Sequence, residues 1–195
     1  MGLRAKKTVG VLAIQGDFER HVHQLNLVGA RPVEVRLPQD LRQLDAVILP
    51  GGESTTINIM IDRFELREPL LQFGRSKPMF GTCAGMIMLA RRIENNISGV
   101  KPLGLMDIDV DRNGYGRQVH SFEDRVQADL SGSTADLTAT FIRAPRVTRL
   151  GAGATPLAFW QGDPVLIEQG LLLAASFHAE LNDDTTLLEY FLTKG

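Results

Sequence analysis

The one cysteine of the 195-residue chain, Cys83, lies in a G-x-C-x-G sequence that could hold a catalytic nucleophile. Apolar residues 78–80 precede it, and the helical pattern of residues 84–92 follows it. A strand, a tight turn and a helix with the nucleophile at the apex form a nucleophile elbow, which Gly81 and Gly85 allow to turn sharply. The helix N-terminus would favour the reactive thiolate. A buried structural cysteine is the alternative, because unpaired cysteines are often buried.

A cysteine nucleophile needs a base, and the base needs a group that orients it. His178 follows the apolar run of residues 171–177, and Glu180 comes two residues later. Side chains two residues apart in extended chain point the same way, so Glu180 could hold one imidazole nitrogen while the other faces Cys83. A solvated histidine and glutamate at the end of a strand is the alternative interpretation. Beside an elbow cysteine, the catalytic interpretation is favoured.

The three other histidines carry a weaker signal. His21 and His23 are two residues apart in a helical pattern, so they share no face and are predicted to be ordinary helix residues and not metal ligands. His120 lies in a polar region with no obvious partner. A single cysteine also excludes an internal disulfide and a zinc site built from several cysteines. We expect no metal and no organic cofactor.

Acyl transfer at an amide also needs donors for the oxyanion that forms. The amide of Ala84, at the start of the helix after Cys83, is one candidate donor. The Gly51-Gly52 turn supplies a second, and we favour the amide of Gly52. Glycine there allows the peptide to flip, so the donor pair could be made or unmade. A strand-to-helix turn that only requires glycine is the alternative.

Length and composition indicate an ordinary globular protein. The chain has 44% hydrophobic and 23% charged residues and a formal net charge of −2, which leaves no basic surface for nucleic acid. We expect a single domain over residues 1–195. The apolar run after the basic N-terminus is too short for a signal peptide, and no stretch approaches the roughly 18 apolar residues of a membrane span. We therefore expect a cytoplasmic protein without a membrane partner.

The order of predicted elements indicates an α/β protein. Strands at residues 9–14, 32–37, 45–50 and 79–80 alternate with helices at residues 18–28, from 55, at 65–74 and at 84–92. Such alternation predicts right-handed crossovers and a three-layer, doubly wound, mostly parallel sheet. Ligands bind at the carboxyl ends of such strands. Gly51-Gly52 and Cys83 fall at two of these ends, so they could face one crevice.

The second half of the chain changes character. It contains short predicted strands separated by turns, followed by a closing helix over residues 184–192. The strands are residues 106–111, 138–142, 157–160, 165–169 and 171–177. This pattern favours a mixed or antiparallel extension of the same sheet.

The chain resembles the PdxT/SNO family, the glutaminase subunits of pyridoxal 5′-phosphate synthase, within the class I (triad) glutamine amidotransferases. The matching stretches are residues 12–17, 49–56, 79–85, 112–113, 116–119, 121–123, 141–145 and 176–181. They span nearly the whole chain in the family's order. The elbow fits many amidotransferases, whereas the P-G-G-E-S-T-T and F-I-R-A-P runs are more specific. The resemblance implies a flavodoxin-like class I amidotransferase fold.

The resemblance also implies residue roles. Cys83, His178 and Glu180 would form a triad that hydrolyses L-glutamine to L-glutamate and ammonia through a glutamyl thioester. The positions that would bind glutamine are Gly52, Glu53, Ser54, Arg112, Ile142 and Arg143. Two departures affect the fine geometry of the pocket. Ala179 stands where the family usually has proline, and Gly114-Tyr115 where it commonly has serine or alanine and then phenylalanine.

The implied partner is a (β/α)₈-barrel synthase subunit that builds pyridoxal 5′-phosphate from a pentose phosphate and a triose phosphate. The family's assembly is a large ring of synthase subunits with glutaminases on its outside. Because free ammonia is protonated in water, direct transfer to a synthase is advantageous. We predict that the loop Gln15, Gly16 and Asp17, at the end of the first strand, contacts this partner. Docking could then fix the Gly51-Gly52 peptide in its donor orientation.

Other functions fit parts of the pattern. The nearest is the glutaminase subunit of another amidotransferase, such as imidazole glycerol phosphate synthase. A cysteine hydrolase or peptidase could use the same elbow. A non-catalytic interaction subunit ranks lowest, because no member of the triad is missing.

Overall fold

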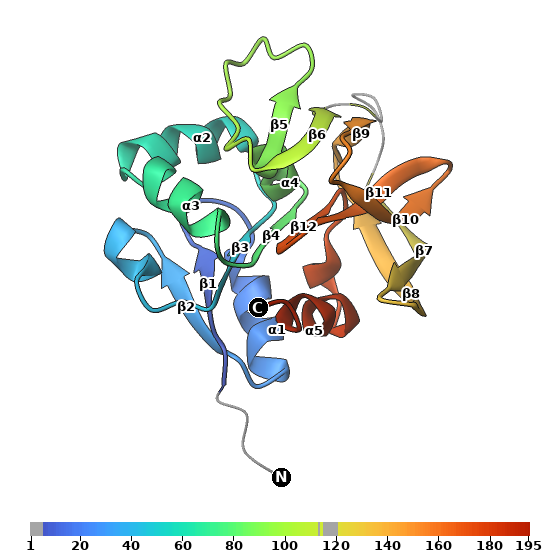
Figure 1. Ribbon diagram of the computed structural model, residues 1–195, viewed down its shortest axis with the longest axis horizontal. Coiled ribbons are helices and arrows are strands. Elements are labelled where there is room, and N and C mark those ends of the chain that lie inside the picture. Colours follow the sequence, from blue (N-terminus) through green and yellow to red (C-terminus); the bar gives the residue numbers. More distant parts are fainter. Residues whose placement is uncertain (1–5, 113, 115–120) are drawn as a thin grey trace.

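A nine-stranded sheet forms the centre of the computed structural model, which describes residues 6–112, 114 and 121–195 (Figure 1). One half of this sheet is parallel, in the order β2-β1-β3-β4-β12. Its strands are β1 Thr8–Leu12, β2 Arg31–Val35, β3 Ala46–Leu49, β4 Met79–Thr82 and β12 Leu172–Ala175. The predicted parallel half is therefore confirmed. Residues 113 and 115–120, which include His120, Tyr115 and the family stretch at residues 116–119, lie outside the described residues.

The other half of the sheet is antiparallel, as the sequence predicts. From β12 it continues in the order β11-β10-β7-β8. These strands are β11 Asp163–Gln169, β10 Thr155–Trp160, β7 Phe122–Leu130 and β8 Ser133–Phe141. Strand β7 is not among the predicted strands, because charged and polar residues occupy most of its exposed face, while Val126, Ala128 and Leu130 are buried on the other face.

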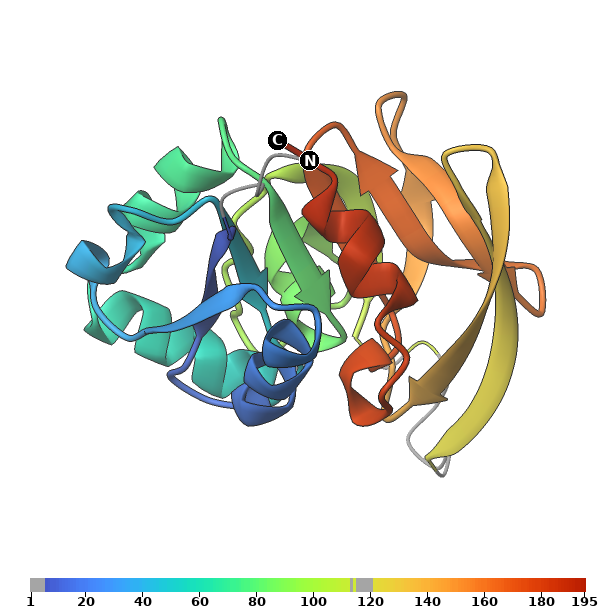
Figure 2. The ribbon, with the colours of Figure 1, turned by 90° about the horizontal axis from the view of Figure 1, so that it is seen from below.

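Helices cover both faces of the parallel half, which gives the predicted three layers (Figure 2). Helices α1 Phe18–Leu27 and α5 Thr186–Leu192 lie on one face, and α2 Ser54–Arg63, α3 Arg67–Gly74 and α4 Ala84–Leu89 lie on the other. Successive residues of a parallel strand point alternately toward the two helix layers. Val9 and Val11 of β1 pack on the α1 and α5 side, and Leu12 packs on the α2 side. Burial on both faces explains the unbroken apolar strands.

A second, three-stranded sheet is not predicted by the sequence analysis. It has the order β5-β6-β9, with β5 Ala90–Ile93, β6 Met106–Asp111 and β9 Arg146–Leu150. The prediction of one helix over residues 84–92 is wrong at its end, because the helix stops at Leu89. Residues 84–90 are all buried, and two exposed residues, Arg91 and Arg92, then precede buried Ile93. This burial does not alternate, so β5 is defined by its parallel pairing with β6 and not by a local strand pattern.

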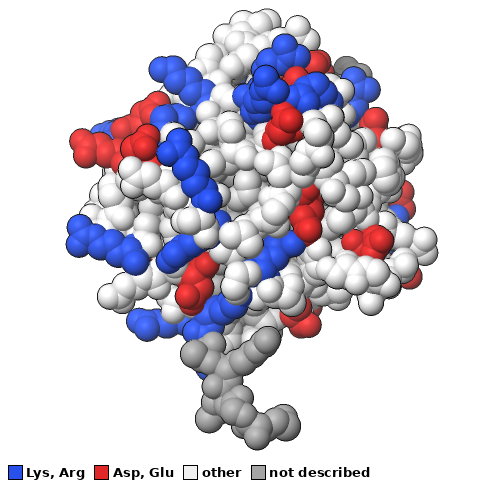
Figure 3. Space-filling model, in the orientation of Figure 1, with Lys and Arg blue, Asp and Glu red and all other residues white. Residues whose placement is uncertain are grey.

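Two short 3₁₀ turns complete the chain, η1 Pro38–Leu41 and η2 Ala179–Leu181. No helix among the described residues is long and apolar enough to cross a membrane. Positive and negative side chains are interspersed over the face in Figure 3. The carboxyl ends of β3, β4 and β12 are neighbours in the sheet, so the turns that follow them lie at one edge.

Candidate active site

Cys83 lies at a sharp turn between β4 and α4. Its backbone has φ 50° and ψ −105°, a conformation that residues other than glycine rarely adopt. The amide of Cys83 donates to the carbonyl of Ala175 on the neighbouring strand (2.8 Å). A Cβ on Gly85 would lie 2.0 Å from the carbonyl oxygen of Leu49, and one on Gly81 would lie 2.5 Å from the backbone of Gly85. Both elbow glycines are therefore required by close packing.

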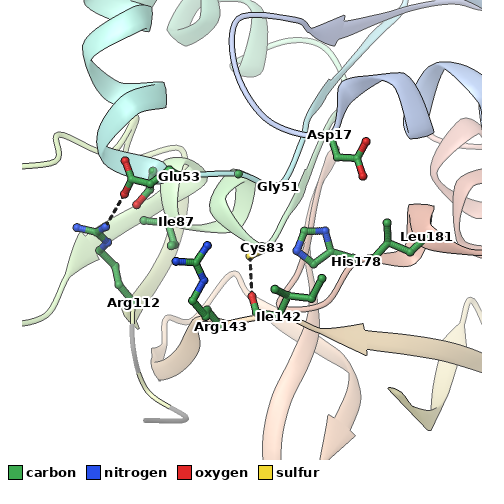
Figure 4. A pocket seen from close by; sticks show the side chains of 12 residues that line it. Asp17, Gly51, Glu53, Cys83, Ile87, Arg112, Ile142, Arg143, His178 and Leu181 are labelled. Atoms are coloured by element: carbon green, nitrogen blue, oxygen red, sulfur yellow. Dashed lines mark hydrogen bonds and ion pairs between the residues drawn. The ribbon is translucent and has the colours of Figure 1, made fainter. Parts of the chain in front are cut away.

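His178 and Glu180 lie beside this turn. His178 Nδ1 lies 2.7 Å from Glu180 Oε1, and both side chains are buried. The amide of His178 donates to the carbonyl of Thr140 on β8 (2.8 Å), which fixes the backbone after β12. The turn η2 then brings Glu180 back toward the imidazole. With Nδ1 occupied by Glu180, Nε2 remains for Cys83, and Figure 4 shows the imidazole next to the sulfur.

The electrostatics favour a protonated imidazole. Burial lowers the pKa of His178, but hydrogen bonds with Cys83 and Glu180 and the negative charge of both outweigh it and raise the pKa to about 10. Burial likewise raises the pKa of Glu180, but the imidazoles of His21 and His178 outweigh it, and the net pKa is lowered. Glu180 is therefore a carboxylate that holds an imidazolium. An imidazolium next to Cys83 favours attack by the thiolate form.

The Gly51-Gly52 turn leaves room for His178. A Cβ on Gly51 would lie 2.2 Å from Cε1 of the imidazole. The carbonyl of Gly51 accepts from the amide of Asp17 at 3.4 Å, so the trans peptide directs the amide of Gly52 the other way. Gly52 has φ 155°, which favours glycine.

The loop Gln15, Gly16 and Asp17 lies directly against this turn. Gln15 Oε1 accepts a hydrogen bond from the amide of Glu53 (2.9 Å). A Cβ on Gly16 would lie 1.9 Å from the carbonyl oxygen of Gly51. The structure therefore couples the predicted partner loop to the predicted oxyanion turn.

A pocket opens in front of Cys83 and His178 (Figure 4). All of the residues predicted to bind glutamine line it: Gly52, Glu53, Ser54, Arg112, Ile142 and Arg143. Ile87 and Leu181 also line it and are missed by the sequence analysis. The sulfur of Cys83 lies 3.7 Å from the carbonyl oxygen of Ile142. Ala84 is buried as the first residue of α4, where an amide has no partner within its own helix.

Glu53 has local contacts that the sequence analysis does not predict. Its carboxylate caps α2 by accepting from the amide (2.6 Å) and hydroxyl (3.0 Å) of Thr56, and it pairs with Arg112 at 3.2 Å. Slight burial raises the pKa of Glu53, but the hydrogen bonds from Thr56 and Thr55 lower it overall. Glu53 therefore orients Arg112 at the edge of the pocket.

His21 is the residue near the site that sequence reasoning misses. The structure places its buried Nε2 3.2 Å from Thr82 Oγ1 and 3.6 Å from Glu180 Oε1. His23, in contrast, is exposed and lies 3.5 Å from Asp183. The missed signal is helical spacing, because His21 is three residues after Phe18 and four before buried Leu25 and so shares their inward face.

Ala179, the departure from the family pattern, is the first residue of η2. Proline suits that position, and His178 before it has the extended backbone (φ −95°, ψ 98°) that a following proline favours. We expect Ala179→Pro to raise the free energy of unfolding by about 0.5–1 kcal/mol, because proline restricts the unfolded chain. Urea denaturation measures this. A lower stability would show that proline does not fit here.

Comparison with known proteins places these features in a family. The model of the SNO glutamine amidotransferase family matches residues 11–194. The pyridoxal 5′-phosphate synthase subunit PdxT of Solibacter usitatus is 47% identical over 96% of this chain and 99% of its own length. The same subunit of Geobacillus kaustophilus is 47% identical over 94% and 92%. A crystal structure of a glutamine amidotransferase superposes with a TM-score of 0.88, at 42% identity over 95% of this chain and 97% of that one.

Proposed function

The chain belongs to the SNO glutamine amidotransferase family, and from that premise we propose that it is the glutaminase subunit of a pyridoxal 5′-phosphate synthase. It hydrolyses L-glutamine to L-glutamate and ammonia and supplies the ammonia to a synthase partner. The observation that carries the proposal is the meeting of an elbow cysteine with a buried histidine–glutamate pair in one pocket. The similarity to PdxT subunits over nearly the full chain supports the choice of synthase.

The chemistry follows from the ion pair at the elbow. The Cys83 thiolate attacks the side-chain amide carbon of glutamine and forms a tetrahedral intermediate, whose oxyanion the amides of Ala84 and Gly52 stabilise. His178 donates its proton to the amide nitrogen, ammonia leaves and a glutamyl thioester remains. His178 then takes a proton from water, the hydroxide attacks the thioester, and glutamate leaves. Glu180 holds the imidazole throughout.

The pocket residues suit the backbone end of a free amino acid. Its α-carboxylate needs charged or amide donors, and its ammonium needs an acceptor. Arg112 and Arg143 supply the donors, and Glu53 supplies the acceptor. Ser54 and Ile142 shape the pocket around the chain of the substrate. The existing pair between Arg112 and Glu53 keeps both charged groups at the entrance.

The partner has the form of a (β/α)₈-barrel synthase subunit in a large ring, with this chain on the outside. We assign contact with that subunit to the loop Gln15, Gly16 and Asp17. Its hydrogen bonds to Glu53 and Gly51 support this assignment, since a partner pressing on the loop would act directly on the turn that supplies the Gly52 amide.

Glutamine hydrolysis with and without the synthase tests the function and the loop together. We expect the synthase to stimulate the release of glutamate, and Gln15→Ala to lower the stimulated rate by about 10-fold, because the Glu53 amide loses its acceptor. Gln43→Ala is the matched control, since Gln43 is exposed and lies before the amino end of β3, whereas the site lies at the carboxyl ends of the strands. Equal rates for the wild type alone, the wild type with synthase and the Gln15 variant would reject the switch.

The same assay separates the other candidate functions. Stimulation by the synthase subunit of imidazole glycerol phosphate synthase, and not by the pyridoxal 5′-phosphate synthase subunit, would assign the chain to that pathway. Cleavage of peptides without release of ammonia from glutamine would identify a peptidase.

A further inference from the structure

His21 of α1 is a buried polar residue that the mechanism above does not use. Its side chain is 2% exposed, although α1 is a surface helix whose exposed residues are mostly polar. Burying an imidazole is costly unless its nitrogens find partners. Two polar groups lie near its Nε2: the carboxylate of Glu180, which is a member of the triad, and the hydroxyl of Thr82, which is next to Cys83 in sequence.

The first partner is the carboxylate of Glu180. Oε1 of Glu180 lies 2.7 Å from Nδ1 of His178 and 3.6 Å from Nε2 of His21. Among the described residues, Oε2 has no hydrogen-bond partner. A buried carboxylate with so few donors is poorly fixed and costly to keep ionised. Glu180, the acid that orients the base, therefore has two imidazoles near its carboxylate, those of His178 and His21.

The second partner is Thr82, the residue immediately before the nucleophile. Thr82 is completely buried at the end of β4, and its Oγ1 lies 3.2 Å from Nε2 of His21. One imidazole thus lies against both the strand that ends at Cys83 and the turn that carries Glu180. Among the described contacts, no other single group touches both the Thr82 and the Glu180 side chains.

A neutral His21 ring can donate one hydrogen bond, from whichever ring nitrogen carries the proton. Burial lowers its pKa; Glu180 and Asp17 raise it and His178 lowers it, and the net pKa is lowered. The ring is therefore neutral near pH 7. In the tautomer with a proton on Nε2, the N–H donates to Thr82 Oγ1, and Glu180 Oε1 lies 3.6 Å from the same nitrogen. The neutral ring therefore lies beside the carboxylate without cancelling the charge that Glu180 offers to His178.

We propose that His21 is a positioning residue for the triad: its Nε2–H donates to the Thr82 hydroxyl while the ring lies against the Glu180 carboxylate, and His21 thereby fixes the distance between the base His178 and the nucleophile Cys83. The proposal rests on the glutaminase function proposed above. It is distinct from catalysis by His21, whose closest described contacts are with Thr82 and Glu180. The role accounts for a polar residue on the inward face of a helix.

The test is glutamine hydrolysis by His21→Leu in the complex with synthase. Leucine keeps the bulk and removes the donor. We expect kcat to fall by about 10- to 100-fold, with KM changed less than about twofold, because the triad loosens while the substrate pocket is untouched. Because the imidazole of His21 beside the carboxylate lowers the pKa of Glu180, its loss raises that pKa, and the acidic limb of kcat/KM moves to higher pH by about one unit.

Three further variants make the result decisive. His21→Gln, which keeps an N–H donor, should recover most of the kcat and return the acidic limb to its wild-type position. His23→Leu removes the exposed histidine of the same helix and should leave both quantities unchanged. Should His21→Leu prove too unstable to assay, His21→Asn carries the same expectation, because its shorter amide does not reach both oxygens.

Separate outcomes would overturn the inference and the function. A His21→Leu protein with lower thermal stability but wild-type kcat and an unmoved acidic limb would show that His21 is only structural. A wild-type chain that releases no ammonia from glutamine with its synthase would instead contradict the proposed function.

Discussion

Cys83→Ser should lose nearly all glutamine hydrolysis, by about 10⁴-fold or more, even in the complex with the synthase. The site is built for a thiolate, because an imidazolium whose pKa is raised to about 10 lies beside the sulfur and a carboxylate holds that imidazolium. A serine hydroxyl is a much weaker acid than a thiol, so the same imidazole cannot hold it as an anion before attack. The substitution changes one atom and leaves the elbow glycines in place.

The measurement is release of ammonia and glutamate, with retained thermal stability and synthase binding as the control for folding. In the wild type, a thiol-reactive analogue of glutamine should label Cys83, and glutamine should compete with the label while peptides do not. Because Cys83 is the one cysteine, the variant should take up no label. Release of ammonia by Cys83→Ser as fast as by the wild type would exclude cysteine catalysis.

The first half of the fold could be predicted because its physics is local. Each parallel strand is an apolar run that is buried on both faces, and each turn carries glycine where the chain makes its sharpest bends. Strand β3 shows this: Ala46 and Ile48 pack toward one helix layer, and Val47 and Leu49 pack toward the other. Local patterns of this kind indicate well where strands occur along the chain, but they indicate poorly the order of those strands in the sheet.

The second half depends on contacts between distant segments. Strand β7 is mostly charged on its exposed face, and β5 has four residues whose two arginines extend the preceding helical pattern. Arg92 pairs with Asp109 across the small sheet at 3.1 Å, a partner 17 positions away that no local pattern indicates. The helix at residue 84 therefore ends for tertiary reasons.

The residues of the site also fall into two groups: those that local sequence patterns indicate and those that they do not. Cys83, Gly52 and His178 are marked by glycine turns and strand ends, so their approach could be inferred from topology. The roles of Arg112 and Arg143 depend on the family resemblance, because a lone arginine carries no positional signal. Local spacing relates His21 only to residues of its own helix, whereas its contact with Glu180 joins residues 159 apart in sequence.

Glu180→Gln should lower kcat/KM by about 10²- to 10⁴-fold and move its alkaline limb to lower pH. Glutamine keeps the size of the side chain, but its amide presents either an oxygen or an N–H to Nδ1 of His178, so the ring is no longer held in one tautomer. The direction of the pH effect follows from the charges. Burial alone lowers the pKa of His178, and Cys83 and Glu180 together raise it to about 10. Removing one of the two must lower it.

A lower pKa for His178 means that the imidazolium is lost at a lower pH. Both the stabilisation of the thiolate and the proton for the departing ammonia depend on that imidazolium, so activity falls earlier as the pH rises. Glu189→Gln is the matched control, since Glu189 is exposed on α5 and bonds only to Thr185 among the hydrogen bonds described. The measurement is kcat/KM against pH with the synthase present. An alkaline limb that stays near pH 10 in Glu180→Gln would show that Glu180 does not tune His178, and its 2.7 Å contact with the imidazole would then only support the fold.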